Sequence, residues 1–219
     1  MDYPRFGLAY TNKFTKVWND QGSRAKLDLT IWRPYLAPFG FLGDYPVGGY
    51  NEPIDASTAY IHAVVDDDPA KPALKPPVRL EPIWFYPSPS PFPLPPPLNE
   101  VKVICQPVAP DGYVACGFVG ATARTGQDLT KLIVPGLMCV RSDLTVDLYN
   151  PPYRPATPPI SNFVWNDHGS RLPNNVSVFR LESRDTGIAT MWAAPKYMTA
   201  KDHVSSFVTI RPDACFPMT

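Results

Sequence analysis

The sequence predicts an all-β protein with a β-prism-like fold, in which three antiparallel sheets share one core and are related by approximate threefold symmetry. One observation is a repeat: residues 17–24 (VWNDQGSR) return as residues 164–171 (VWNDHGSR). In both copies a large aromatic follows the tryptophan by 14 positions, inside an apolar strand pattern. The second observation is composition, because 29 prolines leave almost no uninterrupted run of good helix formers.

A weaker third copy lies between these two. Ile83-Trp84 resembles the start of the first copy, and residues 103–107 resemble residues 30–34. The turn of this middle copy is replaced by a proline-rich loop. The sequence therefore predicts one domain over residues 1–219, made of three degenerate repeats of about 5–78, 79–158 and 159–219. A distorted β-sandwich is the alternative architecture.

Strands are predicted where apolar residues alternate with polar ones between turn formers. Each repeated turn combines Asn and Asp, which bond their own backbone, with a glycine that tolerates positive φ. A helix has room only at 194–203, where Pro195 limits it. The predicted strands are 6–10, one at Trp18, 27–31, 39–44 and 58–65, then 80–84, 101–106, 112–119, 132–134 and 138–140, and finally 161–165, 176–181, 187–192 and 207–211.

Charge and composition exclude several classes of function. The 20 basic and 20 acidic residues cancel, so the chain lacks the overall positive charge of a nucleic-acid binder or of a protein held to lipid by charge alone. No secretory signal and no apolar run of membrane-spanning length are present in the sequence. The four cysteines, Cys105, Cys116, Cys139 and Cys215, fit reduced thiols better than a disulfide framework. A cytoplasmic location is the simplest expectation, with peripheral membrane association or unconventional export as alternatives.

Four segments carry a family resemblance: residues 18–23 (WNDQGS), 31–34 (IWRP), 112–117 (GYVACG) and 138–144 (MCVRSDL). Together, and in this order, they resemble the vacuolar protein sorting-associated protein 62 family. The repeats of that family look similar to β-prism domains of an endosomal-sorting subunit and of some perforin-like toxins, which bind membranes or glycans. The resemblance therefore implies a lectin-like or membrane-binding module. The middle unit departs from the pattern, since its turn motif is lost.

The two repeated turns are the first candidate site. A carboxylate, backbone N–H groups and a cation at a loop tip can bind a sugar or a phosphate head group, and the preceding tryptophans could offer a stacking face. The alternative is structural, because the same residue types build a tight turn and a tryptophan before it is normally core. The candidate ligand-binding residues are Asp20, Gly22, Ser23, Arg24, Asp167, Gly169, Ser170 and Arg171.

The proline-rich loop 85–98 is the second candidate, because it is apolar and carries no charge before Glu100. Such a loop can contact a membrane or a protein partner, or it can fold back over an open end of the prism. Its candidate contact residues are Phe85, Tyr86, Phe92, Leu94 and Leu98. Arg24 and Arg171 are matched after the turns, as are Arg33 and Arg180 in or after the strands. Surface ion pairs of these arginines with Asp20, Asp28 or Asp167 are the simplest expectation, and arginines left unpaired at one end of the prism could contact phosphate head groups.

Catalytic and metal-binding signals are weak. His62, His168 and His203 show no metal-ligand spacing, and Asp66 to Asp68 are typical of a solvated turn more than of a calcium site. His168 lies between Asp167 and Ser170, but neighbours on a turn rarely form a catalytic set. We therefore expect no metal and no cofactor. The sequence favours a non-enzymatic module that binds glycans or membrane lipids through loops at one end of the prism. A toxin-like or protein-docking module and an enzyme with an unrecognised site are the alternatives.

Overall fold

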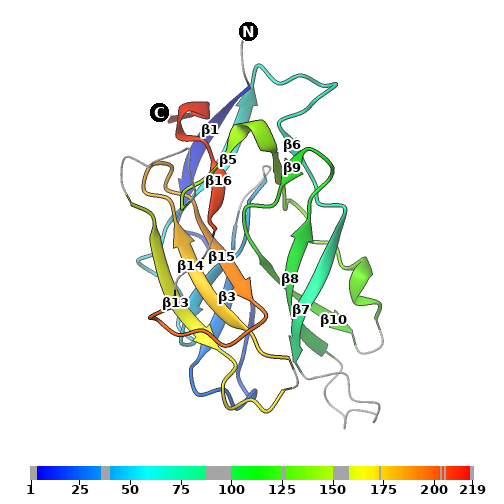
Figure 1. The fold of residues 1–219 in the computed structure, drawn as a ribbon, viewed down its shortest axis with the longest axis vertical. Coiled ribbons are helices and arrows are strands. Elements are labelled where there is room, and N and C mark those ends of the chain that lie inside the picture. The colour runs from blue at the N-terminus through cyan, green and yellow to red at the C-terminus, as the bar shows by residue number, and fades with distance from the viewer. Residues whose placement is uncertain are drawn as a thin grey trace.

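The computed structural model describes residues 4–35, 40–86, 100–124, 127–149, 158–172, 174–202, 204 and 206–217. The protein is elongated and built almost wholly of short strands (Figure 1). Helical structure in these ranges is confined to three single-turn 3-10 segments: η1 (Leu129–Lys131), η2 (Ser142–Leu144) and η3 (Pro212–Ala214). The all-β prediction is confirmed.

Three antiparallel sheets of three strands each form the lower part of the molecule in Figure 1. Each predicted unit supplies one sheet, with the central strand flanked by the other two. The sheets are β2 (Phe14–Asn19), β3 (Leu29–Pro34) and β4 (Tyr45–Gly48); β7 (Arg79–Tyr86), β8 (Glu100–Val108) and β10 (Val119–Arg124); and β13 (Ile160–Asn166), β14 (Ser177–Glu182) and β15 (Ala189–Ala194).

The same register irregularity occurs in all three sheets, one residue before the tryptophan. A bulge of this kind bends a strand and redirects the side chain that follows it. The residues at the bulges are Val17, Ile83 and Val164. After the bulge, Trp18 pairs with Ile31, Trp84 with Ile104, and Trp165 with Val178.

The redirected tryptophans meet in one buried cluster between the sheets. The rings of Trp18 and Trp84 are stacked with centroids 5.8 Å apart, and Trp165 meets Trp84 edge-on at 5.5 Å. All three side chains are at most 4% exposed. Aliphatic side chains fill the space around the rings: Leu29, Ile31, Ile104 and Val178 of the central strands, and Val176 just before β14. Three sheets around a shared core give the prism-like arrangement.

Smaller sheets form the upper part of the molecule in Figure 1. A second apolar cluster, which includes Phe6, Ile61, Val140 and Ile210, is buried there. The strands are β1 (Arg5–Thr11), β5 (Thr58–Val65) and β17 (Cys215–Pro217); β6 (Leu74–Lys75), β9 (Tyr113–Val114) and β11 (Cys139–Arg141); and β12 (Thr145–Asp147) and β16 (Val208–Ile210).

Some predicted element boundaries are wrong. The third strand of the first unit is β4, beyond the predicted 39–44. The described part of that segment packs too closely for a strand with ordinary side chains: a Cβ on Gly40 would lie 2.4 Å from Met138 Cγ, and one on Gly43 would lie 2.9 Å from Gly117 Cα. Residues 132–134 form no strand, and residues 194–202 form no helix.

Candidate functional site

The first repeated turn is organised by the carboxylate of Asp20. Its Oδ1 accepts the backbone N–H of Leu29 at 2.9 Å, and its Oδ2 accepts the hydroxyl of Ser23 at 3.2 Å. The Ser23 hydroxyl oxygen in turn accepts the N–H of Ala25 at 3.1 Å. Asp20 and Ser23 are both 2% exposed, so these side chains hold the loop from inside.

The second repeated turn has the same bonds. Asp167 accepts the N–H of Val176 at 3.1 Å and the hydroxyl of Ser170 at 3.4 Å, and Ser170 accepts the N–H of Leu172 at 3.2 Å. Asp167 is fully buried and Ser170 is 8% exposed. The carboxylates and hydroxyls predicted as ligand contacts are therefore engaged within their own turns.

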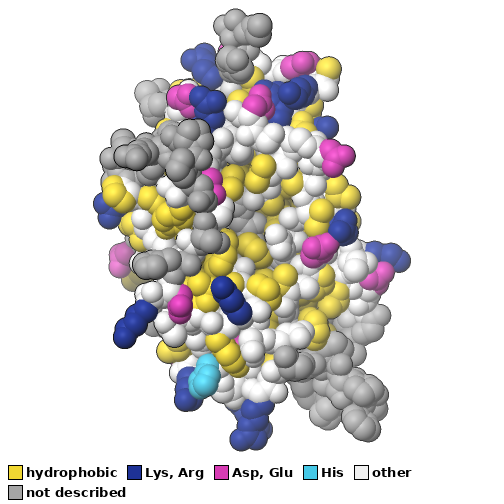
Figure 2. Space-filling model, viewed as in Figure 1, with side chains coloured by type: hydrophobic (Ala, Val, Ile, Leu, Met, Phe, Trp, Pro, Cys, Tyr) yellow, Lys and Arg dark blue, Asp and Glu magenta, His cyan; other side chains and the backbone are white. Residues whose placement is uncertain are grey.

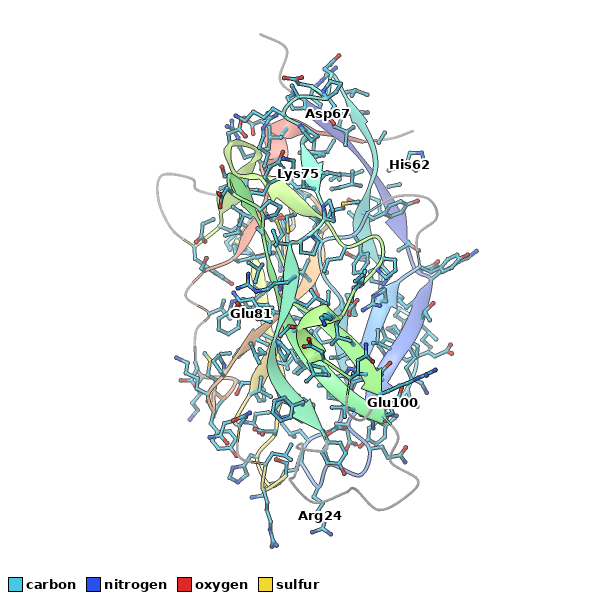
Figure 3. The ribbon with its side chains drawn as sticks, turned by 90° about the vertical axis from the view of Figure 1, so that its right-hand side faces the viewer. Arg24, His62, Asp67, Lys75, Glu81 and Glu100 are labelled. Carbon is cyan, nitrogen blue, oxygen red and sulfur yellow. The ribbon has the colours of Figure 1, made fainter. Side chains whose placement is uncertain are left out.

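The tips of both turns use left-handed backbone. Gly22 and Gly169 have φ of 89° and 99°, where glycine is favoured because it has no Cβ. Arg24 and Arg171 have φ of 67° and 61°, which arginine rarely adopts. The glycines and the arginines are exposed, and Figure 3 places Arg24 at the lower tip of the molecule. The exposed half of the predicted site thus consists of these four residues.

The three core tryptophans connect the units in a cycle, since each indole N–H donates to a different unit from its own. Two of the acceptors are the turn carboxylates, and in the middle unit a backbone carbonyl stands in for the missing carboxylate. The bonds run from Trp165 to Asp20 Oδ2 at 2.9 Å, from Trp84 to Asp167 Oδ2 at 3.3 Å, and from Trp18 to the carbonyl of Val103 at 3.2 Å. The tryptophans are core residues and offer no face to a ligand.

Burial dominates the electrostatics of the two carboxylates. It raises the pKa of Asp20 and of Asp167 above the usual 3.8, although the backbone, serine and indole donors act in the opposite direction. Burial also lowers the pKa of Lys102, a cation that the nearby Asp20 carboxylate favours. Burial therefore disfavours the charged forms of all three side chains.

The middle unit supports the first turn with side chains. The hydroxyl of Tyr86 donates to the carbonyl of Gly22 at 2.6 Å, and Lys102 Nζ donates to the carbonyl of Asn19 at 2.6 Å. The second turn contacts the first directly, because the N–H of Lys26 donates to the carbonyl of His168 at 2.9 Å. The turns and their supports therefore form one surface, the turn end, which comprises residues 19–28, 48–50, 86, 102, 166–172 and 196–197.

The turn end exposes cations and aromatic or apolar side chains together. Arg24, Lys26 and Arg171 are exposed and form no ion pair with any described residue. Tyr50 and Tyr197 are 41% and 46% exposed. Leu27, at 42% exposure, adds an apolar side chain. The side chains of this surface can contact an anion and an apolar layer at the same time.

The tyrosines occupy matching places in the first and third units. Before Tyr50, the carbonyl of Gly49 accepts the hydroxyl of Thr30 at 2.7 Å. Before Tyr197, the carbonyl of Lys196 accepts the hydroxyl of Ser177 at 2.8 Å. Sequence reasoning missed these tyrosines because they lie outside the repeated segment. The repeated spacing from the central strand to the tyrosine is the signal that finds them.

The other matched arginines are ion-paired. Arg33 binds Asp44 through two contacts of 2.9 Å, and Arg180 binds Glu182 at 2.6 Å. Of the proline-loop candidates, Phe85 is half-buried against the core of its own sheet, and Tyr86 belongs to the turn end. The candidates Phe92, Leu94 and Leu98 lie outside the described residues.

The described histidines and acidic residues show no catalytic or metal-binding assembly. The ring of His168 packs against Tyr197 with centroids 5.6 Å apart, and His62 lies near Tyr60 in the upper part of the molecule (Figure 3). His203 lies outside the described residues. Asp67 accepts the N–H of Ala73 at 2.7 Å. In the part of the chain that the structure describes, no three His, Cys, Asp or Glu side chains are placed to hold a metal ion.

All four cysteines are free thiols. Burial raises the pKa of Cys105 and of Cys215 to about 12 and that of Cys139 to about 11, and it raises the pKa of Cys116 as well. High pKa values keep these groups as unreactive thiols near neutral pH. No helix in the described ranges has the length and apolar character needed to cross a bilayer.

The fold is similar to a solved structure, the crystal structure of GNIP1Aa from Chromobacterium piscinae, with a TM-score of 0.67 and 19% sequence identity. The match covers 96% of this chain but only 38% of that protein. No curated protein matches the chain. The model of one family, vacuolar protein sorting-associated protein 62, matches residues 5–192. With the tryptophan-and-turn units lying inside that match, the chain belongs to the vacuolar protein sorting-associated protein 62 family.

Proposed function

We propose that this protein is a non-enzymatic binding module whose turn end binds anionic lipid head groups at a membrane surface. The observation that carries the proposal is the pair Arg24 and Arg171, which stand exposed at equivalent places in two turns and form no ion pair with the described residues. Arginine presents a planar fork of donors that suits phosphate. The net charge of the chain is zero, so such binding must come from a local cluster.

The surroundings of the arginines favour a membrane over a dissolved anion. Each basic residue near an anionic leaflet contributes about 1 kcal/mol, so Arg24, Lys26 and Arg171 together supply about 3 kcal/mol. Tyrosine is favoured at membrane–water interfaces, where its ring is apolar and its hydroxyl remains hydrated. Tyr50 and Tyr197 have the exposure that this role requires. Figure 2 shows basic side chains at the lower end of the molecule, where Figure 3 places Arg24, so the side chains of the turn end can contact a flat surface together.

Liposome co-sedimentation tests the proposal. Wild-type protein should bind vesicles of phosphatidylcholine and phosphatidylserine, and should bind pure phosphatidylcholine vesicles much more weakly. The variant Arg24→Gln/Arg171→Gln should lose about ten- to thirtyfold in affinity for the anionic vesicles, from two contributions of about 1 kcal/mol. The variant Lys13→Gln/Arg184→Gln is a matched control, since both residues are exposed and lie outside the turn end. Equal losses in the two double variants would reject the proposal.

A glycan is the second candidate ligand, and the contact between Tyr50 and Asp28 favours it. Burial, together with the neighbouring carboxylates of Asp28 and Asp20, raises the pKa of Tyr50 above its usual 10, and Asp28 is itself exposed. A carboxylate beside an aromatic ring can bind sugar hydroxyls and a sugar face. A glycan array with wild type and Asp28→Ala tests this alternative. If neither protein binds a glycan on the array while the wild type binds anionic vesicles, the result rejects the glycan alternative and supports the lipid proposal.

Docking of a protein partner through loop 85–98 stays a prediction, because most of the loop lies outside the described residues. An enzymatic activity also stays open as the third class, and no described group of residues supports it with a specific observation. The expected cytoplasmic location stays a prediction as well. Deleting residues 87–97 and measuring both vesicle binding and stability separates docking from a structural role of the loop.

A further inference from the structure

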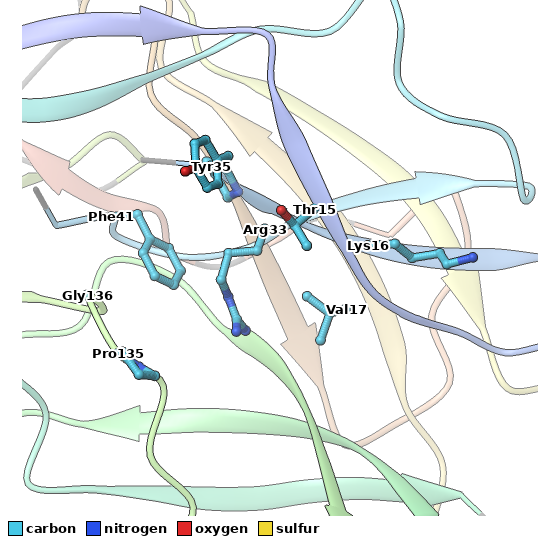
Figure 4. Close-up of a pocket in the computed structure, with 9 residues that line it drawn as sticks. Thr15, Lys16, Val17, Arg33, Tyr35, Phe41, Pro135 and Gly136 are labelled. Atoms are coloured by element: carbon cyan, nitrogen blue, oxygen red, sulfur yellow. The ribbon is translucent and has the colours of Figure 1, made fainter. Parts of the chain in front are cut away.

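A pocket of about 270 Å³ lies where the first sheet meets a loop of the second unit (Figure 4). Strand β2 forms one wall through residues 15–17, and the end of β3 with the residue after it, Tyr35, forms another. Phe41 and the turn at Pro135 and Gly136 close the opposite side. The pocket uses no residue of the turn end.

The far wall of the pocket is held by backbone hydrogen bonds. The N–H of Phe41 donates to the carbonyl of Gly136 at 2.9 Å, and the N–H of Met138 donates to the carbonyl of Phe41 at 2.9 Å. On the near side, the N–H of Tyr35 donates to the carbonyl of Lys13 at 2.8 Å. A pocket whose walls are fixed in this way exists before a ligand arrives, which lowers the entropic cost of binding.

Arg33 carries a fixed cation into the pocket. Its Nε donates to Asp44 Oδ1 and its Nη2 to Asp44 Oδ2, both at 2.9 Å, and Nη2 also donates to the carbonyl of Gly120 at 2.7 Å. These bonds use three of the five guanidinium N–H groups. The two on Nη1 donate to no described residue, although the side chain is only 25% exposed. Figure 4 shows Arg33 extending between Phe41 and Val17.

The remaining lining combines one polar group with apolar surface. The hydroxyl of Thr15 lies beside the Arg33 side chain in Figure 4 and forms no hydrogen bond with the described part of the chain. The ring of Phe41 lies 5.4 Å from the Arg33 guanidinium carbon, and Val17, Pro34 and Pro135 add apolar contacts. The pocket thus offers the Arg33 guanidinium at one end of that side chain, the Thr15 hydroxyl near its other end, and an apolar surface next to them.

We propose that this pocket binds a small organic carboxylate with a ring-sized apolar body. The carboxylate accepts hydrogen bonds from Arg33 Nη1 and from the Thr15 hydroxyl, and the apolar body packs against Phe41 and Pro135. The volume limits the ligand to a small molecule, since pockets for larger ligands reach about 300–1,000 Å³.

Charge balance agrees with a monoanion. Asp44 is fully buried and already offsets the charge of Arg33. The exposed Lys16, at the rim, forms no ion pair with any described residue and supplies the balancing charge for a bound carboxylate. Its side chain points away from Arg33 in Figure 4, so it contributes long-range attraction and no direct contact.

NMR titration of ¹⁵N-labelled protein with benzoate tests the proposal. Benzamide has the same shape without the charge, and acetate has the charge without the ring. Benzoate should shift the amide signals of residues 15–17, 33, 35, 41 and 136 with millimolar or tighter affinity. Both comparison probes should bind at least about tenfold more weakly, since each lacks one of the two contacts. Equal affinities for benzoate and benzamide, shifts elsewhere in the molecule, or no shift at all would overturn the proposal.

Variants on exposed positions keep the test independent of folding. Thr15→Val removes one donor and should weaken benzoate binding about three- to tenfold. Thr15→Trp should fill the pocket and abolish binding. Asn162 occupies the place of Thr15 in the third sheet, opposite Arg180, so Asn162→Ala is the matched control and should bind benzoate as wild type does. Binding of benzoate by Thr15→Trp with wild-type affinity would reject the pocket as its site.

Discussion

The indole N–H of Trp165 donates a 2.9 Å hydrogen bond to the carboxylate of Asp20, 145 positions earlier in the chain. The same indole N–H also lies 2.8 Å from the carbonyl of Leu27, so it holds the first turn at two points. Because the corresponding bond from Trp84 ends on Asp167, the two turns depend on tryptophans from other units. The turn end is thereby coupled to the core that joins the three sheets.

Trp165→Phe should destabilise the protein by about 2–4 kcal/mol. The change removes the donor to Asp20 and Leu27 and leaves a gap in a fully buried site, and both effects are costly. Urea unfolding gives the free energy of unfolding. Trp192→Phe, at a half-buried position of β15, is the control and should cost clearly less. Similar losses in the two variants would show that the hydrogen bond to the turn contributes little.

Ser23→Ala and Ser170→Ala should each destabilise the protein by about 1 kcal/mol, because each removes a donor to a buried carboxylate and an acceptor for a backbone N–H. The two losses should add within about 0.5 kcal/mol in the double variant if the turns are separate copies of one local structure. Thermal and urea unfolding of the four proteins measure this. A large loss at one serine and none at the other would contradict the equivalence of the turns.

The buried carboxylates should make stability depend on pH in a specific direction. Burial raises the pKa of Asp167 above its usual 3.8, so the folded protein binds this proton more tightly than the unfolded chain. The stabilisation from protonated Asp167 is therefore full below about pH 3.8 and is lost as the pH rises through the folded pKa. The free energy of unfolding of the wild type minus that of Asp167→Asn should therefore decrease as the pH rises from about 4 to about 7. A difference that increases over this range would contradict the raised pKa.

The repeated residues made the three sheets around the tryptophan cluster predictable. The spacing from Trp18 to Trp32 and from Trp165 to Phe179 identified two sheets, and the weak match at Ile83 and Trp84 identified the middle one. In each sheet the tryptophan pairs with an aliphatic residue of the central strand. The exact extents of the three repeats stay a prediction, because the upper sheets join strands from different units.

The site was predictable only in part, because local sequence does not show which face of a turn is buried. Asp20 and Arg24 stand four positions apart in one motif, yet the first is buried and the second exposed. The roles of Tyr86 and Lys102 were beyond sequence reasoning. Their acceptors are backbone carbonyls more than 60 positions away, and any residue type presents such a carbonyl.

Lys102→Met should loosen the first turn and leave the second one unchanged. The substitution keeps an apolar stem of similar length but removes the donor to the carbonyl of Asn19. Loss of one hydrogen bond of about 0.5–1.5 kcal/mol should speed local opening about three- to tenfold. Amide hydrogen exchange at Ser23 and Ala25 reports this opening, because both N–H groups are bonded within the turn.

The equivalent amides of the second turn, Ser170 and Leu172, are the internal control, since their bonds are the same but Lys102 does not support them. Tyr86→Phe removes the other support of the first turn, the bond to Gly22, and should give the same asymmetric pattern. Lys13→Met, on an exposed lysine outside the turn end, should change neither turn. Faster exchange in both turns at once would mean that Lys102 stabilises the whole fold, and the middle unit would then have no specific role in shaping the first turn.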